Sequence, residues 1–218
     1  MKKTFIIIFL LFFSFIFFVA CENNKKIENN ISEITKIYFQ GESADNDLIC
    51  FISVGERENP YKVDGVHNPV CDFSLISLKL SNCTYEQIKI CLIVNDEESE
   101  VILYHNPISD IYINDIGYAL NENDVIKVGY GEINFNVYNI SKDFKIDYQK
   151  ALDISFEKFS EQISSLYKNG QFMGECYLKI LSNSNNNQLF WYFSIQTVTQ
   201  KTMNLILSVD SGEVVVVN

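Results

Sequence analysis

The chain carries a run of alternating apolar residues at positions 88–94, with the sequence Ile88-Lys89-Ile90-Cys91-Leu92-Ile93-Val94. The aliphatic side chains of Ile88, Ile90, Leu92 and Val94 fall on every second position, and successive side chains of a β-strand point to opposite faces of its sheet. The run therefore predicts a strand with one buried face. Segments on both sides of it are also rich in Ile, Val, Phe and Tyr and are separated by turn residues.

Seven short strands are predicted between residues 31 and 142, with no helix among them. They are expected at 34–40, 47–54, 72–80, 87–95, 100–105, 124–129 and 132–139. The glycines of Val128-Gly129-Tyr130-Gly131-Glu132 favour a hairpin turn between the last two. Because a series of short strands of this kind is typical of a β-sandwich, we expect an all-β, sandwich-like domain over 31–142.

The periodicity changes at Asp147, where apolar residues begin to recur at intervals of three or four, the spacing of one helix face. They are Tyr148, Leu152, Phe156, Phe159, Ile163 and Leu166. Asp147 is a good N-cap, because its carboxylate can accept from the open N–H groups of a first helical turn. Lys168-Asn169-Gly170 has the cation and the glycine that favour a helix end. One long helix is therefore predicted over 148–168.

Four strands are expected after this helix, at 173–182, 188–198, 202–209 and 213–217. Ser211-Gly212 supplies the turn between the last two. Residues 143–218 are therefore predicted to form an α+β domain in which one long helix packs on a four-strand antiparallel sheet. The whole chain is expected to be α+β but mostly β.

Residues 147–217 resemble the PepSY domain. The resemblance is carried by three segments: Asp147-Tyr148-Gln149-Lys150-Ala151-Leu152, Leu189-Phe190-Trp191-Tyr192-Phe193-Ser194-Ile195 and Leu205-Ile206-Leu207-Ser208-Val209-Asp210-Ser211-Gly212-Glu213-Val214. Ser208 stands where the family usually has an acidic residue, and Ser155 where it has a helix alanine. The resemblance implies a unit that binds or restrains peptidases, or another regulatory module, and it implies no catalytic residues.

The N-terminus has the features of an export signal. Lys2 and Lys3 are followed by the apolar stretch Phe5 to Val19 and then by Phe18-Val19-Ala20-Cys21, which resembles the lipobox of bacterial lipoproteins. The apolar stretch is shorter than the roughly 20 residues of a membrane-crossing helix. The resemblance implies a signal peptide over 1–20 and a lipid on Cys21. The polar residues 21–30 are then a flexible tether, and the protein is anchored in the cell envelope, outside the cytoplasm.

Charge excludes nucleic acid as a partner. The chain has 17 Lys and Arg against 28 Asp and Glu, a net charge of −11, and loss of Lys2 and Lys3 would make it −13. Such a surface repels phosphate backbones and anionic headgroups. The expected membrane contact is therefore the lipid on Cys21, and stable anchoring requires two or more acyl chains.

Five cysteines remain besides Cys21: Cys50, Cys71, Cys83, Cys91 and Cys176. An odd number leaves at least one thiol free. The absence of a C-x-x-C pair argues against a zinc knuckle or a thioredoxin-like site. Cys91 and Cys176 fall in predicted strands, where free cysteine behaves as a small hydrophobe. Unpaired structural thiols are favoured, and one or more disulfides are the alternative that export permits.

The only two histidines lie in similar contexts. His67-Asn68-Pro69-Val70-Cys71-Asp72 is echoed by His105-Asn106-Pro107-Ile108-Ser109-Asp110. One interpretation is a metal site of His67, Asp72, His105 and Asp110, since imidazole and carboxylate suit zinc or manganese. The favoured interpretation is two similar turns that enter strands, because Asn-Pro initiates turns. We therefore expect no metal and no cofactor.

No catalytic signature is present in the sequence. It has no Gly-x-Ser-x-Gly elbow, no glycine-rich phosphate loop and no His-Glu-x-x-His, and both histidines are assigned to turns. The expected role is non-catalytic binding or regulation, directed at an extracytoplasmic peptidase or another envelope protein. The alternative is a structural or adhesive surface lipoprotein. The aromatic run Phe190, Trp191, Tyr192 and Phe193 is the candidate interface, because one alternating pair is expected under the helix and the other is available to a partner.

Overall fold

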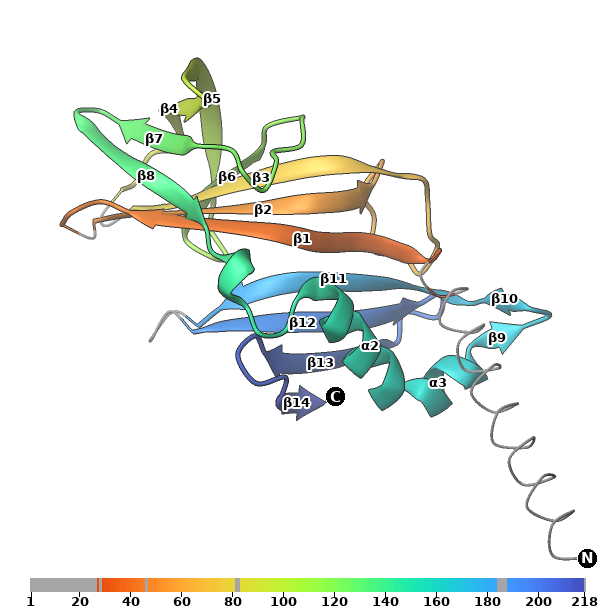
Figure 1. The fold of residues 1–218 in the computed structure, drawn as a ribbon. Helices are drawn as coiled ribbons and strands as arrows, with labels where there is room; N and C mark the ends of the chain where they lie inside the picture. Colours follow the sequence, from red (N-terminus) through yellow and green to blue (C-terminus); the bar gives the residue numbers. More distant parts are fainter. Residues whose placement is uncertain (1–26, 28, 46, 81–82, 184–187, 218) are drawn as a thin grey trace, which may run out of the picture.

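The computed structural model describes residues 27, 29–45, 47–80, 83–183 and 188–217 (Figure 1). The predicted signal peptide, Cys21 and most of the predicted tether lie outside these residues. The described part of the chain contains no helix with the length and hydropathy of a membrane span.

The N-terminal part is a closed antiparallel β-barrel of eight strands. Their order around the barrel is β1-β2-β3-β6-β5-β4-β7-β8, and β8 pairs back onto β1. The strands are β1 (Ile31–Glu42), β2 (Leu48–Glu58), β3 (Val70–Leu80), β4 (Gln87–Val94), β5 (Glu97–Asn106), β6 (Ile111–Asp115), β7 (Ile126–Tyr130) and β8 (Ile133–Asn139).

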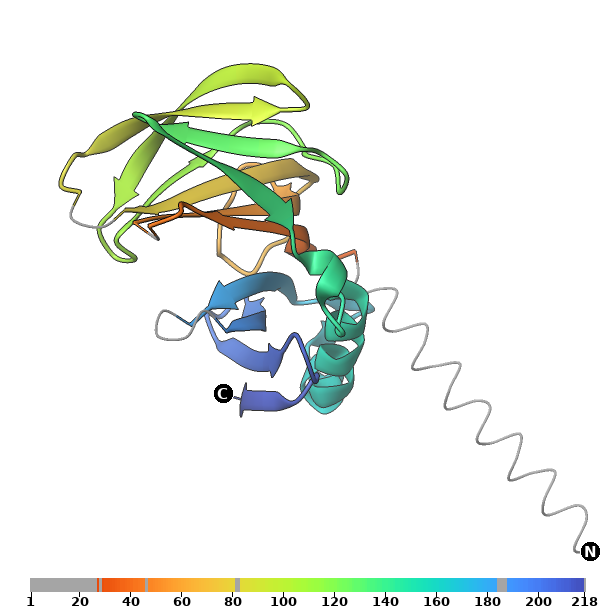
Figure 2. The same cartoon turned by 60° about the vertical axis from the view of Figure 1, so that its left-hand side comes forward.

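The predicted β-sandwich is wrong because the strands close on themselves. Phe39 of β1 pairs with Asn139 of β8, and Gln40 pairs with Tyr138. The turned view in Figure 2 shows green β8 running to orange β1. Sandwiches and barrels share the alternation of inward and outward side chains, so only a long-range pairing of this kind distinguishes them. The sequence also missed the five-residue strand β6.

Apolar side chains fill the interior of the barrel. Each of the eight strands contributes inward residues that are fully or almost fully buried, among them Phe39, Ile52, Ile76, Leu92 and Val128. Ile88, Ile90 and Leu92 are buried as the alternation of β4 predicted. The inside of the barrel is therefore a core, as is usual for small barrels, and its outer face is the surface available for binding.

The C-terminal part continues the same sheet. It consists of β11 (Gly174–Ser182), β12 (Leu189–Thr197), β13 (Thr202–Ser208) and β14 (Val214–Val217), which are antiparallel to one another. β11 pairs in parallel with β1, from Ile31 with Cys176 to Ile34 with Leu178. One sheet of twelve strands therefore runs from β14 to β8.

The predicted single helix over 148–168 is also wrong. The chain forms the 3-10 turn η1 (Ser141–Asp143), α2 (Tyr148–Lys158) and α3 (Ser160–Ser165), with a break at Phe159. Asp147 is the N-cap as predicted, and its side chain accepts from the N–H of Lys150 at 2.8 Å. Serines after the break, Ser164 and Ser165, donate to backbone carbonyls in the preceding turn, a competition that weakens helices.

The Asn169-Gly170 pair forms a hairpin turn and not a helix cap. It connects β9 (Tyr167–Lys168) to β10 (Gln171–Phe172), and both residues have positive φ, 52° and 79°. Asn-Gly favours helix ends and tight hairpins alike. The hairpin prevails here, since the ring centroids of Tyr167 and Phe172 lie 5.6 Å apart across it.

A second core lies between the helices and the C-terminal strands. It contains the inward residues of α2 and α3 (Leu152, Phe156, Ile163) and of β11 to β13 (Leu178, Trp191, Phe193, Leu205, Leu207). Ile34 and Tyr38 of β1 and Ile27, which the sequence placed in the tether, are buried in it as well. β1 therefore contributes buried side chains to both cores. The domain limits at 31–142 and 143–218 stay a prediction.

Candidate binding groove

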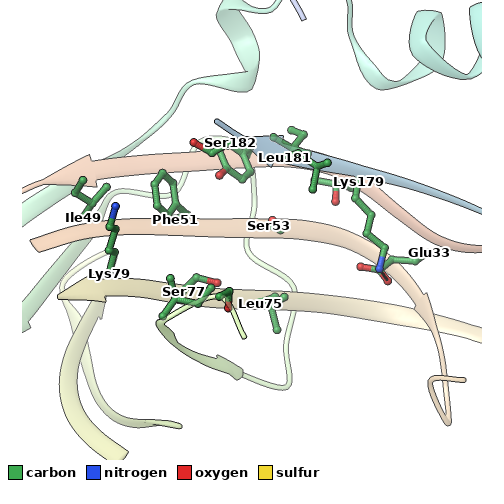
Figure 3. A pocket seen from close by; sticks show the side chains of 15 residues that line it. Glu33, Ile49, Phe51, Ser53, Leu75, Ser77, Lys79, Lys179, Leu181 and Ser182 are labelled. Atoms are coloured by element: carbon green, nitrogen blue, oxygen red, sulfur yellow. Dashed lines mark ion pairs between the residues drawn. The ribbon is translucent and has the colours of Figure 1, made fainter. Parts of the chain in front are cut away.

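A groove runs over the outer face of β1, β2 and β3 and is walled on one side by the end of β11 (Figure 3). Its volume is about 410 Å³. We define the groove by the following lining residues: Glu33, Thr35 and Tyr38 of β1; Ile49, Phe51 and Ser53 of β2; Leu75, Ser77 and Lys79 of β3; Ser109 and Ile111; and Lys179, Ile180, Leu181 and Ser182 of β11.

The groove exists because β1 and β11 separate. Their parallel ladder ends at the pair Ile34–Leu178, although both strands continue beyond it. A bulge in β1 between Thr35 and Ile37 helps to form the floor. The extra residue of a bulge reverses the alternation of side chains along the strand. Thr35 and Tyr38 therefore both face the groove, although residues three positions apart in a regular strand point to opposite faces.

Gly55 lies opposite this bulge and permits the close approach of β2. A Cβ atom at position 55 would stand 1.8 Å from the carbonyl oxygen of Ile34. No side chain fits at that distance, so glycine is required for this pairing of β1 with β2.

The floor of the groove is apolar and its rim is polar. Tyr38 and Phe51 stack with ring centroids 6.1 Å apart, and Ile49, Leu75 and Ile111 extend this surface. Leu181 is 41% exposed on the opposite wall. The rim carries the hydroxyl groups of Ser53, Ser77, Ser109 and Ser182. A narrow apolar floor with a few hydroxyls on its rim is suited to an amphipathic ligand.

One edge of β11 faces the groove with its backbone groups. The N–H of Cys176 donates to Asn30 on the β1 side at 2.8 Å, whereas the N–H of Asn183 donates to Gln188 on the β12 side at 2.8 Å. Backbone groups of a strand alternate in direction with a period of two. Ile180 and Ser182 therefore point their N–H and C=O groups toward β1, at positions where β1 no longer pairs with β11. We call these two residues the open edge of β11.

A charged cluster closes the other end of the groove. Lys179 Nζ lies 2.7 Å from Glu33 Oε2 and donates to the hydroxyl of Tyr61 at 2.7 Å. Burial raises the pKa of Tyr61, and the neighbouring Glu33 carboxylate raises it further. The Lys179 ammonium also lies over the rings of Tyr61 and Tyr177, at 5.2 and 5.4 Å from their centroids. Lys179 is therefore held in place by one carboxylate and two aromatic rings.

Buried carboxylates hold the loop 59–69 that presents Tyr61. The Glu175 side chain, on the fully buried start of β11, accepts from the N–H groups of Asp64 at 2.9 Å and Gly65 at 2.7 Å, and from the hydroxyl of Ser32 at 2.7 Å. Glu58 accepts from the N–H groups of Lys62 and Asn68 in the same loop. The loop is thus part of the scaffold of the groove.

The four residues of the metal hypothesis are only partly brought together. His105 Nε2 lies 2.9 Å from Asp110 Oδ1 across the turn between β5 and β6. His67 Nδ1 lies 3.2 Å from the Ser32 hydroxyl in the loop before β3, and Asp72 is exposed on β3. The described residues include no group of three or more His, Cys, Asp or Glu side chains that could hold a metal ion. His67-Asn68-Pro69 leads directly into β3, whereas His105 and Asn106 are the last residues of β5 and Pro107 begins the turn toward β6.

The predicted aromatic interface divides into two pairs. Trp191 and Phe193 are buried under the helices: the Trp191 indole N–H donates to the Ile146 carbonyl at 2.7 Å, and the Phe193 ring meets Phe156 edge-on at 5.6 Å. Phe190 and Tyr192 are half-buried on the other face of β12. This half-buried pair is the one available to a partner, and its role as an interface stays a prediction.

All five cysteines of the described residues are unpaired. Cys50 and Cys176 are buried in the two cores, where burial raises the pKa of each thiol. A raised pKa keeps these two thiols protonated and unreactive.

The groove escaped sequence reasoning because its residues come from strands far apart in the chain. The fall in burial along β11, from fully buried at its start to exposed at Ser182, marks the open edge in the structure but is not a signal in the sequence. Scans against protein-family models, curated proteins and solved structures returned no match to this chain.

Proposed function

We propose that this protein is an exported, lipid-anchored binding protein whose groove holds an extended segment of a partner polypeptide. The role is non-catalytic. The observation that carries it is the open edge of β11, which offers backbone groups beside an apolar floor. A peptide strand can add to such an edge through main-chain hydrogen bonds, while its alternate side chains enter the groove. Exposed strand edges are otherwise usually covered or charged.

The size of the groove supports a short segment. Its floor extends along β2 from Ile49 to Ser53. Four residue steps in a strand span about 13 Å. A partner strand of about five residues would therefore cover the floor, with two or three apolar side chains against Phe51 and Leu75. We expect low intrinsic affinity for such a contact, since a short strand buries little area.

A peptidase of the cell envelope is the partner class that we favour. The resemblance of residues 147–217 to PepSY domains supports this choice, and the predicted lipid on Cys21 would place the groove at a membrane surface. A pull-down from detergent-solubilised envelope should recover a peptidase in stoichiometric amount. Recovery of glycan or lipid alone would favour the structural or adhesive role.

Replacing Ile180 with proline should weaken peptide binding about tenfold. Proline has no backbone N–H, so the variant loses the hydrogen bond that Ile180 would donate to the bound peptide. The peptide carbonyl that would accept this bond is then left unpaired. The ladder with β12 is preserved, because the N–H of Ile180 points away from β12. The probe is the peptide acetyl-Asn-Val-Thr-Val-Thr-Val-Asn-amide, titrated by NMR against the full-length protein in detergent.

Ile180→Val is the matched control, since valine keeps both the N–H and an apolar side chain packed against the second core. It should bind the peptide within about twofold of the unmodified protein, because the side chain changes by one methylene. Equal affinity of the proline and valine variants would contradict pairing at the open edge. Failure of the unmodified protein to bind the peptide at millimolar concentration would contradict the proposed function.

Replacing Cys21 with serine should release the protein from the membrane or leave it unprocessed. A serine hydroxyl cannot take the thioether-linked lipid that the lipobox implies, and a lipid chain contributes about 0.8 kcal/mol of membrane affinity per buried methylene. Fractionation of cells with an antibody against the protein measures the change. A fully processed Cys21→Ser protein that still sediments with membranes would contradict the anchor.

A further inference from the structure

We infer that Lys79 selects partner segments that carry a carboxylate at the Ser182 end of the groove. This inference rests on the proposed function and adds a charge preference to it. Three charged residues line the groove: Glu33, Lys79 and Lys179. Figure 3 shows Lys79 near Ile49 and Phe51, with Glu33 and Lys179 together at the far end.

The two ends of the groove differ in their charge balance. Glu33 and Lys179 neutralise each other through an ion pair of 2.7 Å. Lys79 is exposed, and within the described residues its ammonium makes no ion pair. Its cross-strand neighbour is Ile49, and Ser77 precedes it on the same face of β3. Among the three charged residues of the groove lining, Lys79 is therefore the one without an ion-pair partner in the described part of the chain; Glu42, the neighbour of Ile49 on β1, lies outside the lining.

This local charge is opposite to that of the whole protein. The chain has a net charge of −11, so acidic segments are repelled from most of its surface. An acidic residue at the end of a bound strand would meet Lys79, whereas a basic residue there would face a like charge. Charge placement of this kind selects partners more than it adds affinity.

Three peptides test the inference on the full-length protein in detergent. Each has the sequence acetyl-X-Val-Thr-Val-Thr-Val-X-amide, with X as Asp, Asn or Lys. The test residue occupies both ends, so that one copy meets Lys79 whichever way the strand runs. We expect the Asp peptide to bind about threefold more tightly than the Asn peptide and about tenfold more tightly than the Lys peptide, as for an exposed ion pair. The differences should vanish in 1 M salt, where the screening length is about 3 Å.

The variant Lys79→Glu should reverse the order, so that the Lys peptide binds most tightly. Lys127→Glu is the matched control, because it changes the net charge equally and Lys127 is exposed on β7, outside the groove lining. It should keep the original order, with Asp first.

Each outcome decides between the two claims. If the three peptides bind equally, or if Lys79→Glu keeps the original order, the inference about Lys79 is overturned, while sensitivity to Ile180→Pro would still support the groove. If Lys127→Glu reverses the order as well, the preference comes from net charge and the inference is also overturned. If none of the peptides binds, both the inference and the proposed function fail.

Discussion

Replacing Phe159 with alanine is expected to lower the free energy of unfolding by about 3–5 kcal/mol. The Phe159 side chain is 2% exposed, and its ring centroid lies 6.1 Å from that of Phe193 in the second core. The residue also joins α2 to α3, since its N–H donates to Ser155 and its carbonyl accepts from Ile163. Alanine would lose the buried ring and leave a cavity where the two short helices meet the sheet.

Glu157→Ala is the matched control, because Glu157 is an exposed residue of the same helix. Its loss should cost less than about 0.5 kcal/mol. Urea unfolding followed by tryptophan fluorescence measures both variants, since the single Trp191 lies in the same core. Equal losses for the two variants would show that the helices do not pack on the sheet through this residue.

Replacing Glu175 with alanine is the second change expected to have a large effect, about 3–4 kcal/mol, which corresponds to roughly two hydrogen bonds to a charged group. The Glu175 carboxylate is fully buried and accepts from Asp64, Gly65 and Ser32. Without it, two backbone N–H groups of the loop 59–69 lose their acceptor. The loop should detach from β11, and Tyr61 should leave Lys179.

Glu175→Gln separates the hydrogen bonds from the volume of the side chain. Its amide oxygen can still accept from one or two of the three donors, so about half of the loss is expected. Limited proteolysis provides the structural readout: cleavage within 59–69 should be fastest in the alanine variant and intermediate in the glutamine variant. Equal cleavage in all three proteins would show that Glu175 does not hold the loop.

Strand positions followed from the sequence where a face is buried. β4 alternates in burial as Ile88 to Leu92 predicted, and the four C-terminal strands lie within one or two residues of their expected limits. β6 was missed because its apolar residues Ile111, Tyr112 and Ile113 are consecutive and show no alternation with polar residues. Its partners Leu75 to Leu78 on β3 belong to another part of the chain.

Closure of the barrel could not be read from the sequence. Two residue pairs join β1 to β8, about one hundred positions apart in the chain. The same limit applies to the groove. Phe51, Leu75 and Ile180 each have a local pattern that only assigns them to strands, and their meeting depends on where β1 and β11 separate. The break at Phe159 is different, because the serines around it were visible and carried a known tendency to interrupt helices.

Amide hydrogen exchange at the open edge of β11 is the most direct test of the central claim that a peptide strand pairs there. Exchange rates of the Ile180 and Ser182 amides would be measured by NMR with and without saturating acetyl-Asn-Val-Thr-Val-Thr-Val-Asn-amide. Pairing should slow both amides, because each N–H would then donate to the peptide. Unchanged exchange at Ile180 and Ser182 in the saturated complex would contradict strand addition at this edge.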